Sequence, residues 1–180
     1  MPLPVDRELL KAFEEKLDPS KPEESSIPAK VLGYGEISTV FEIIHESQKE
    51  IAYKRMPLFD TMQQVERYKE IYNRYNELLG EINIEIPEYG AIDVTTDDGR
   101  IVLYLYQRKL PSDSIGNMVI HAVSDDQVMA LTLKVLRELN KVWAFNRDNK
   151  PKIEVAIDGQ ISNWAIKDFD PENLVIDKDV

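Results

Sequence analysis

The chain has 180 residues, 43% of them apolar, and carries a formal net charge of −11 at pH 7. This size and apolar content are enough for a globular core, while the absence of cysteine excludes disulfides, thiolate metal sites and a thiol nucleophile. The acidic balance disfavours general binding to nucleic acid, which draws its affinity from neutralised phosphates. Because no stretch resembles a signal peptide or a membrane span, we expect a soluble, cytoplasmic protein without nucleic-acid or membrane partners.

Residues 1–29 are expected to form a short helix followed by a linker. Apolar side chains recur at helical spacing over residues 6–17, and this segment begins with Asp6, a residue type that caps helix N-termini. Residues 18–28 then contain three prolines among polar residues, a composition that sustains neither a helix nor a strand.

Residues 30–109 have the pattern of an antiparallel sheet that is interrupted by one helix. Three runs rich in Val, Ile, Phe and Tyr follow one another over residues 30–56. Two further strands are expected over residues 88–94 and 100–107, with a turn between them. The pattern therefore predicts five strands, three before the helix and two after it.

The helix between the third and fourth strands is expected to begin at Asp60 and to end at Gly80. Gln63, three residues after Asp60, is the expected partner in a capping box, and glycine commonly follows a helix C-terminus. Glu66 and Glu70 recur on one face of this helix, apart from its apolar positions.

Residues 110–180 are expected to begin a second, helical region. An irregular stretch over residues 110–122 precedes a long helix, which Ser124 and Gln127 would cap and which extends to about Asn146. The wide apolar face of this helix indicates burial. Short apolar runs and polar turns alternate after it.

Gly33 and Gly35 stand one residue apart between the first two expected strands. Missing side chains let a backbone approach a bulky anion, toward which amide hydrogens can point. A β-bulge or a tight hairpin that needs glycine explains the same pair. A strand rather than a helix follows the glycines, and no Gly-Lys-Ser/Thr is present, so neither a Rossmann fingerprint nor a P-loop fits.

Lys54 lies inside the third apolar strand, directly after Ala52 and Tyr53. An ammonium group that is buried without a partner costs several kcal/mol. Lys54 therefore either reaches a solvated face of the strand or meets an anion. Both alternatives are open from the residues alone.

The order of these parts resembles the small lobe of protein-kinase-like enzymes, in which a glycine-rich hairpin, a strand lysine, a helix with a glutamate and two more strands lead to a hinge. The family's G-x-G-x-x-G-x-V loop is matched by GYGEISTV, with Ser38 in place of the third glycine and Val40 at the end. Its Val-Ala-Ile-Lys strand is matched by IAYK, with Ala52 and Lys54. The resemblance implies an ATP site formed by Gly33, Gly35, Ser38, Val40, Ala52, Lys54, Glu70 and Gln107.

The resemblance also implies a role for Lys54 and for one glutamate of the helix. Lys54 would contact the α and β phosphates of ATP, and Glu70 or Glu66 would hold its ammonium in place. We prefer Glu70 because it lies nearer the middle of the helix.

A kinase-like catalytic loop needs an Asp that accepts the proton of the substrate hydroxyl and, five residues later, an Asn that holds Mg²⁺. Asp158 and Asn163 supply this pair. A second metal-binding Asp is expected one short hairpin later, where Asp177 stands, whereas residues 168–170 follow too closely and are interpreted as a turn. Each of these residues is also typical of an ordinary loop.

Two positions depart from the family pattern. Ala156 and Ile157 stand where the family usually has His-Arg or His-Gly, and no Phe-Gly follows Asp177. The missing Arg favours small-molecule kinases of the aminoglycoside phosphotransferase type over regulated protein kinases. A catalytically inactive module that binds a nucleotide or a protein remains the alternative. His45 and His121 lie on different expected elements, so we expect no histidine metal site.

We therefore predict an α+β, kinase-like fold with a five-stranded N-lobe over residues 30–109 and a partial C-lobe over residues 110–180. The predicted function is ATP- and Mg²⁺-dependent phosphoryl transfer to a hydroxyl of a small molecule of unknown identity. We expect the C-lobe to be truncated and to expose a surface through which the chain could self-associate. An α+β domain whose motif matches are accidental is the simpler alternative.

Overall fold

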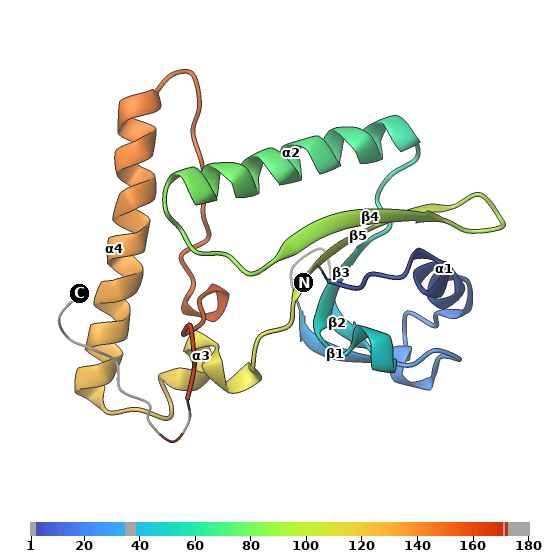
Figure 1. Ribbon diagram of the computed structural model, residues 1–180, viewed down its shortest axis with the longest axis horizontal. Helices are drawn as coiled ribbons and strands as arrows, with labels where there is room; N and C mark the ends of the chain where they lie inside the picture. Colours follow the sequence, from blue (N-terminus) through green and yellow to red (C-terminus); the bar gives the residue numbers. More distant parts are fainter. Residues whose placement is uncertain (1–2, 35–38, 171, 173–180) are drawn as a thin grey trace. The chain divides into compact units, whose positions relative to one another are not determined.

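The structure is a computed structural model that describes residues 3–34, 39–170 and 172 (Figure 1). The chain divides into two compact units, each with an apolar core of its own. Unit 1 comprises Met1–Asn76 and Ile86–Lys109, and unit 2 comprises Glu77–Glu85 and Leu110–Val180. None of the helices in the described ranges combines the length and the apolar character that crossing a membrane requires.

Unit 1 is built on a five-stranded antiparallel sheet, as the sequence predicted. The strands are β1 (Ala29–Tyr34), β2 (Thr39–Ile43), β3 (Ile51–Met56), β4 (Tyr89–Thr95) and β5 (Ile101–Arg108). Their order across the sheet is β1-β2-β3-β5-β4, so the fifth strand lies between the third and the fourth. Two 3-10 helices, η1 (Pro22–Glu24) and η2 (Glu46–Gln48), lie in the connections. The coarse α+β class is thus confirmed.

Helix α1 (Arg7–Lys16) packs on one face of this sheet. Asp6 is its N-cap, because the Asp6 carboxylate accepts a hydrogen bond from the Leu9 amide at 3.0 Å, which confirms the predicted start. The core on this face consists of Leu10, Phe13, Ala29, Phe41, Ile43, Ile51, Tyr53, Val94, Val102 and Tyr104. Burying each of the larger side chains stabilises the fold by about 1.5–3 kcal/mol.

Helix α2 (Met62–Glu81) packs on the opposite face. The core there consists of Met56, Val65, Leu103 and Leu105, with Phe59, Tyr68, Tyr72, Ala91 and Ile101 packed against it. Leu103 and Leu105 alternate with Tyr104 along β5, so the two cores lie on different faces of the sheet. Figure 1 shows α2 and α1 on the two sides of the β4–β5 ribbon.

The start of α2 lies one residue later than the sequence predicted. The Thr61 amide donates to Gln64 Oε1 at 3.2 Å, and the Gln64 amide donates to the Thr61 hydroxyl at 3.3 Å. The capping box is therefore Thr61 with Gln64 and not Asp60 with Gln63. A capping box satisfies two free amides at the start of a helix. The sequence offers two such pairs one residue apart, Asp60 with Gln63 and Thr61 with Gln64.

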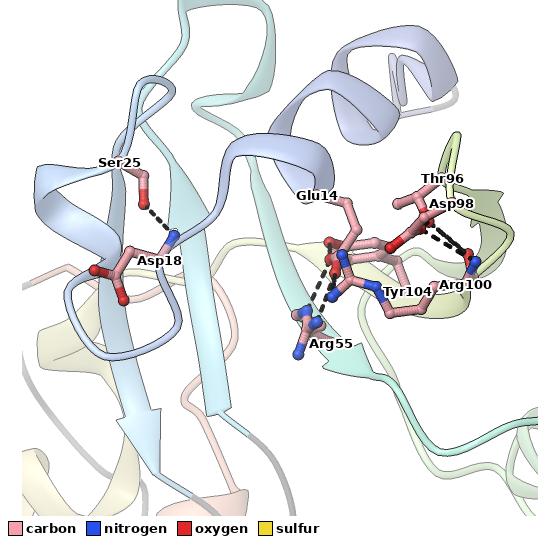
Figure 2. A network of polar contacts seen from close by, with 8 residues as sticks. All are labelled: Glu14, Asp18, Ser25, Arg55, Thr96, Asp98, Arg100 and Tyr104. Atoms are coloured by element: carbon pink, nitrogen blue, oxygen red, sulfur yellow. Dashed lines mark hydrogen bonds and ion pairs between the residues drawn. The ribbon is translucent and has the colours of Figure 1, made fainter.

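A buried carboxylate fixes α1 to the sheet (Figure 2). The Glu14 side chain is fully buried and accepts two hydrogen bonds from Arg55 on β3, at 2.7 and 2.5 Å, and one from the Tyr104 hydroxyl on β5 at 2.5 Å. Arg100 lies 3.2 Å from the same carboxylate. The hydrogen bond to Glu14 raises the pKa of Arg55, and burial raises the pKa of Tyr104 well above its usual range. The buried charge is thus compensated from three directions.

Glu14→Gln is expected to destabilise the protein by about 3 kcal/mol, because it leaves the partly buried Arg55 without its counter-charge. Glu15→Gln on the same helix is the control and is expected to cost less than about 1 kcal/mol, since Glu15 forms a surface pair with Lys11 at 3.7 Å. Urea denaturation of both variants measures the difference. Equal stabilities would contradict the role assigned to Glu14.

Unit 2 is organised around the long helix α4 (Asp125–Asn149), with α3 (Gly116–Val119) and the 3-10 helices η3 (Ser112–Ser114) and η4 (Ile161–Asn163). The Ser124 amide donates to Gln127 Oε1 at 3.3 Å, which confirms the predicted cap. The core of unit 2 consists of Val119, Ala130 and Leu131, with Ile120, Val123, Ile161, Ile166 and Phe169 packed against it.

Gly116→Ala is expected to destabilise unit 2 by about 1–3 kcal/mol, because the added Cβ would lie 2.4 Å from the backbone oxygen of Ile161. Gly80→Ala is the matched control. Gly80 lies within the last turn of α2, and an added Cβ there would meet no described atom within 4 Å. It is expected to stabilise the protein by about 0.5 kcal/mol. Thermal unfolding of the two variants distinguishes these opposite signs.

Candidate functional site

The strand register places Gly33, Val40 and Lys54 in one row across the sheet. Gly33 on β1 pairs with Val40 on β2, and Val40 pairs with Lys54 on β3. Lys54 pairs in turn with Leu105 on β5. Directly paired residues of antiparallel strands point to the same face, and Leu105 belongs to the core beneath α2. The row therefore lies on the α2 side of the sheet.

Ala52 and Gln107 form the adjacent row on the same face. They pair directly, and each lies two positions from a member of the first row. Five of the predicted nucleotide contacts thus share one face, although they come from four strands. These are Gly33, Val40, Ala52, Lys54 and Gln107.

Gly33 follows a β-bulge, since the register shifts between Val31 and Gly33. The bulge that the sequence offered as an alternative is therefore present. However, Gly33 does not have a positive φ, and an added Cβ would meet no atom of the described residues within 4 Å. Neither backbone strain nor crowding requires glycine at this position, and the space above its backbone stays open at one end of the row.

Lys54 is half-buried, and its side chain forms no hydrogen bond or ion pair with any residue that the structure describes. Its neighbour Arg55 points to the opposite face and is held by Glu14 at 2.5 Å. A cation that is partly removed from water without a counter-charge is costly to the fold. Among the described residues, no side chain neutralises Lys54, so its ammonium is available to an added anion.

The structure pairs neither predicted glutamate with Lys54. Glu70 lies 3.3 Å from Arg67, and Glu66 lies 2.9 Å from Lys69, in both cases on α2 itself. Both glutamates are exposed, because the residues that α2 turns toward the sheet are apolar and aromatic. The expected ion pair of Lys54 with Glu70, or with Glu66, is therefore absent among the described residues.

Two surface hollows of unit 1 do not include the residues of this row. One runs along α2 beside Glu66 and Glu70, and the other lies beside His45 and Lys109. Both are shallow and open, and neither includes Gly33 or Lys54.

Asp158 lies in a loop of unit 2 that α4 holds in place. The Asn146 side chain on α4 donates to the Val155 carbonyl at 2.8 Å and accepts from the Val155 amide at 2.7 Å. The Asp158 carboxylate then accepts from the Gln160 amide at 3.0 Å, which closes a short turn. Asn146 was not predicted as a positioning residue, because its partner lies in a segment without regular secondary structure.

Asn163 ends the short helix η4 and is exposed. Backbone hydrogen bonds tie the chain beyond it to the segment before α3, from the Gly116 amide to the Trp164 carbonyl at 2.8 Å and from the Ile166 amide to the Ser114 carbonyl at 2.9 Å. Asp158 and Asn163 therefore belong to one anchored loop. No hydrogen bond joins their side chains in the part of the chain that the structure describes.

Three predicted site residues, Gly35, Ser38 and Asp177, lie outside the described residues. Within the described ranges, no group of three or more His, Asp or Glu side chains could hold a metal ion. The turn predicted over residues 168–170 is confirmed, because Asp168 has a φ of 50° and begins no strand.

The model of a family of unknown function, DUF6206, matches residues 16–176. The chain belongs to this family. The DUF6206 match extends from the last residue of α1 through the whole sheet and α4, so it includes both the Lys54 row and the Asp158 loop. No curated protein matches the chain at a significant level.

Lys54→Met is expected to leave the stability of this DUF6206 protein unchanged or to raise it by up to about 1 kcal/mol, because no described residue pairs with the cation. Arg55→Met on the adjacent position is the matched comparison. It is expected to cost about 3 kcal/mol, since it removes the main counter-charge of buried Glu14. Chemical denaturation compares the two. A large loss of stability in Lys54→Met would show that Lys54 serves the fold.

Proposed function

We propose that this DUF6206 protein binds ATP with Mg²⁺ on the α2 side of its sheet and transfers a phosphoryl group to a hydroxyl of a small molecule, as kinase-like enzymes do. The alignment of Gly33, Val40 and Lys54 in one row is the observation that carries the proposal. The order of elements in unit 1 supports it, because three strands, a helix and two strands follow one another as the resemblance implies. Since ATP is a cytoplasmic metabolite, the proposal includes a cytoplasmic location.

Each residue of the face has a property that nucleotide binding requires. Lys54 supplies a positive charge for the phosphates. Gly33 leaves its backbone open to a bulky anion at the end of the row. Val40 presents a partly accessible, small apolar side chain against which an aromatic base can pack, whereas Ala52 is buried. Gln107, exposed near the end of β5, adds a polar contact.

The reaction would use the anchored loop of unit 2. Asp158 would accept the proton of the acceptor hydroxyl, whose oxygen bonds to the γ-phosphorus while the bond from that phosphorus to the bridging oxygen breaks and ADP leaves. Asn163 offers an exposed amide oxygen of the kind that binds Mg²⁺, and Asp177 would be its partner. Mg²⁺ would neutralise charge on the phosphates. Catalysis would then come from positioning and from charge stabilisation.

A second function, nucleotide binding without turnover, is favoured by a specific observation. Glu66 and Glu70 both pair with cations of α2, so Lys54 is not held in place by a carboxylate of the helix. Kinase-like enzymes have His-Arg or His-Gly where this chain has Ala156 and Ile157, and this difference also favours binding without turnover. This alternative uses the same face of the sheet and the same Lys54.

ATP with Mg²⁺ is expected to raise the unfolding temperature of the protein, because a ligand at a hundredfold excess over its Kd stabilises the native state by about 2.7 kcal/mol. Lys54→Met is expected to abolish the shift. Lys16→Met removes an exposed lysine from α1, on the opposite side of the sheet, and should retain it. Differential scanning fluorimetry measures all three. The absence of a shift in the wild-type protein would contradict both functions.

ADP release separates the two functions. It is measured in the presence of hydroxyl-bearing acceptors, with aminoglycosides and simple sugars as the first panel. Asp158→Asn is expected to keep the thermal shift and to lose the release of ADP. Binding without release in the wild-type protein would support the second function. Loss of binding in Asp158→Asn would contradict the role given to Asp158.

A further inference from the structure

Helix α4, the long orange helix in Figure 1, carries an exposed apolar stripe. Its members are Met129, Leu133, Leu136 and Trp143, which are exposed by 61, 46, 42 and 55%. Together with Asn140 they follow one another at spacings of four, three, four and three residues. This is the spacing of a helix surface that faces another helix along its length. Other positions of α4, including Val135 and Val142, supply its buried side.

We propose that a second copy of this chain docks on the stripe, with the two α4 helices antiparallel about a two-fold axis at Leu136. The axis brings the two Leu136 side chains together. Met129 and Trp143 lie seven residues before and after Leu136, so in the antiparallel arrangement each faces the other across the interface. A thioether against an indole ring is a favourable contact. The stripe is therefore complementary to itself in this direction.

The charges at the ends of α4 select the antiparallel direction. Asp125 and Arg147 lie eleven residues before and after Leu136, which is roughly 16 Å along the helix in each direction. Both lie on the line of the stripe, because eleven residues complete about three helical turns. The axis thus places Asp125 of each copy beside Arg147 of the other. A parallel arrangement would bring like charges together instead.

The polar residue within the stripe fits the same register. Asn140 lies four residues after Leu136, and Thr132, which is also exposed, lies four residues before it. The two-fold axis therefore sets Asn140 opposite Thr132, where an amide and a hydroxyl can bond. A polar residue within such a seam fixes the register of the pair at some cost in affinity. The proposal uses unit 2 alone and does not depend on nucleotide binding.

Sedimentation equilibrium of the full chain tests the proposal. The wild-type protein is expected to form dimers reversibly between micromolar and millimolar concentrations, because a single helix pair buries a small interface. Leu136→Glu is expected to be monomeric throughout this range. Ile71→Glu on α2 also replaces an exposed apolar residue, 54% exposed, and should dimerise like the wild type. Circular dichroism checks that both variants are folded. A monomeric wild type, or a dimer that survives Leu136→Glu, would overturn the proposal.

Charge reversal tests the antiparallel register separately. Asp125→Arg and Arg147→Asp are each expected to weaken dimerisation about tenfold, because each makes like charges meet at both ends of the pair. The double variant restores opposite charges and is expected to return to the wild-type dissociation constant. Failure of the double variant to recover, after both single variants have weakened the dimer, would rule out the antiparallel arrangement.

Discussion

The side chains of β3 alternate between the two faces of the sheet, and the architecture of unit 1 depends on this alternation. Arg55 enters the face beneath α1 and meets the fully buried Glu14, whereas Lys54 enters the opposite face and meets no counter-charge among the described residues. A shift of the register by one residue would exchange the two cations. Glu14 would then lose its partner, so the ion pair beneath α1 also fixes the side to which Lys54 points.

This division assigns different tasks to the two faces. The face beneath α1 is closed by an aromatic core and a compensated charge, and it supplies much of the stability of unit 1. On the face beneath α2, Met56 and Leu105 are buried, while Val40 stays partly accessible and Gly33 leaves its backbone uncovered. A rigid sheet thus carries an open row with one available cation, which is the arrangement that the proposed nucleotide site requires. The stripe on α4 is a separate surface.

Local patterns predicted most of the elements but few of their partners. The five strands and the caps at Asp6 and Ser124 follow from alternation and from residue types within a few positions of each other. The partners of Glu14 are 41 and 90 residues away, and no local pattern indicates them. Each motif residue of the proposed site was predicted from its local sequence pattern. Their position on one face of the sheet depends on which strands pair, and no local pattern indicates this. The rotation of α2 is set by packing against the sheet. It turns Glu70 to solvent, and the expected pair with Lys54 is therefore absent among the described residues.

The central claim is that Lys54 is the lysine that contacts a bound nucleotide. An acyl-phosphate derivative of ATP, which transfers its acyl group to an amine near the phosphates, tests this claim most directly when the modified lysines are located by mass spectrometry. The account predicts that Lys54 is modified ahead of the exposed Lys16 and Lys49 and that excess ATP with Mg²⁺ prevents its modification. Modification of all three at similar rates, without protection by ATP, would contradict it.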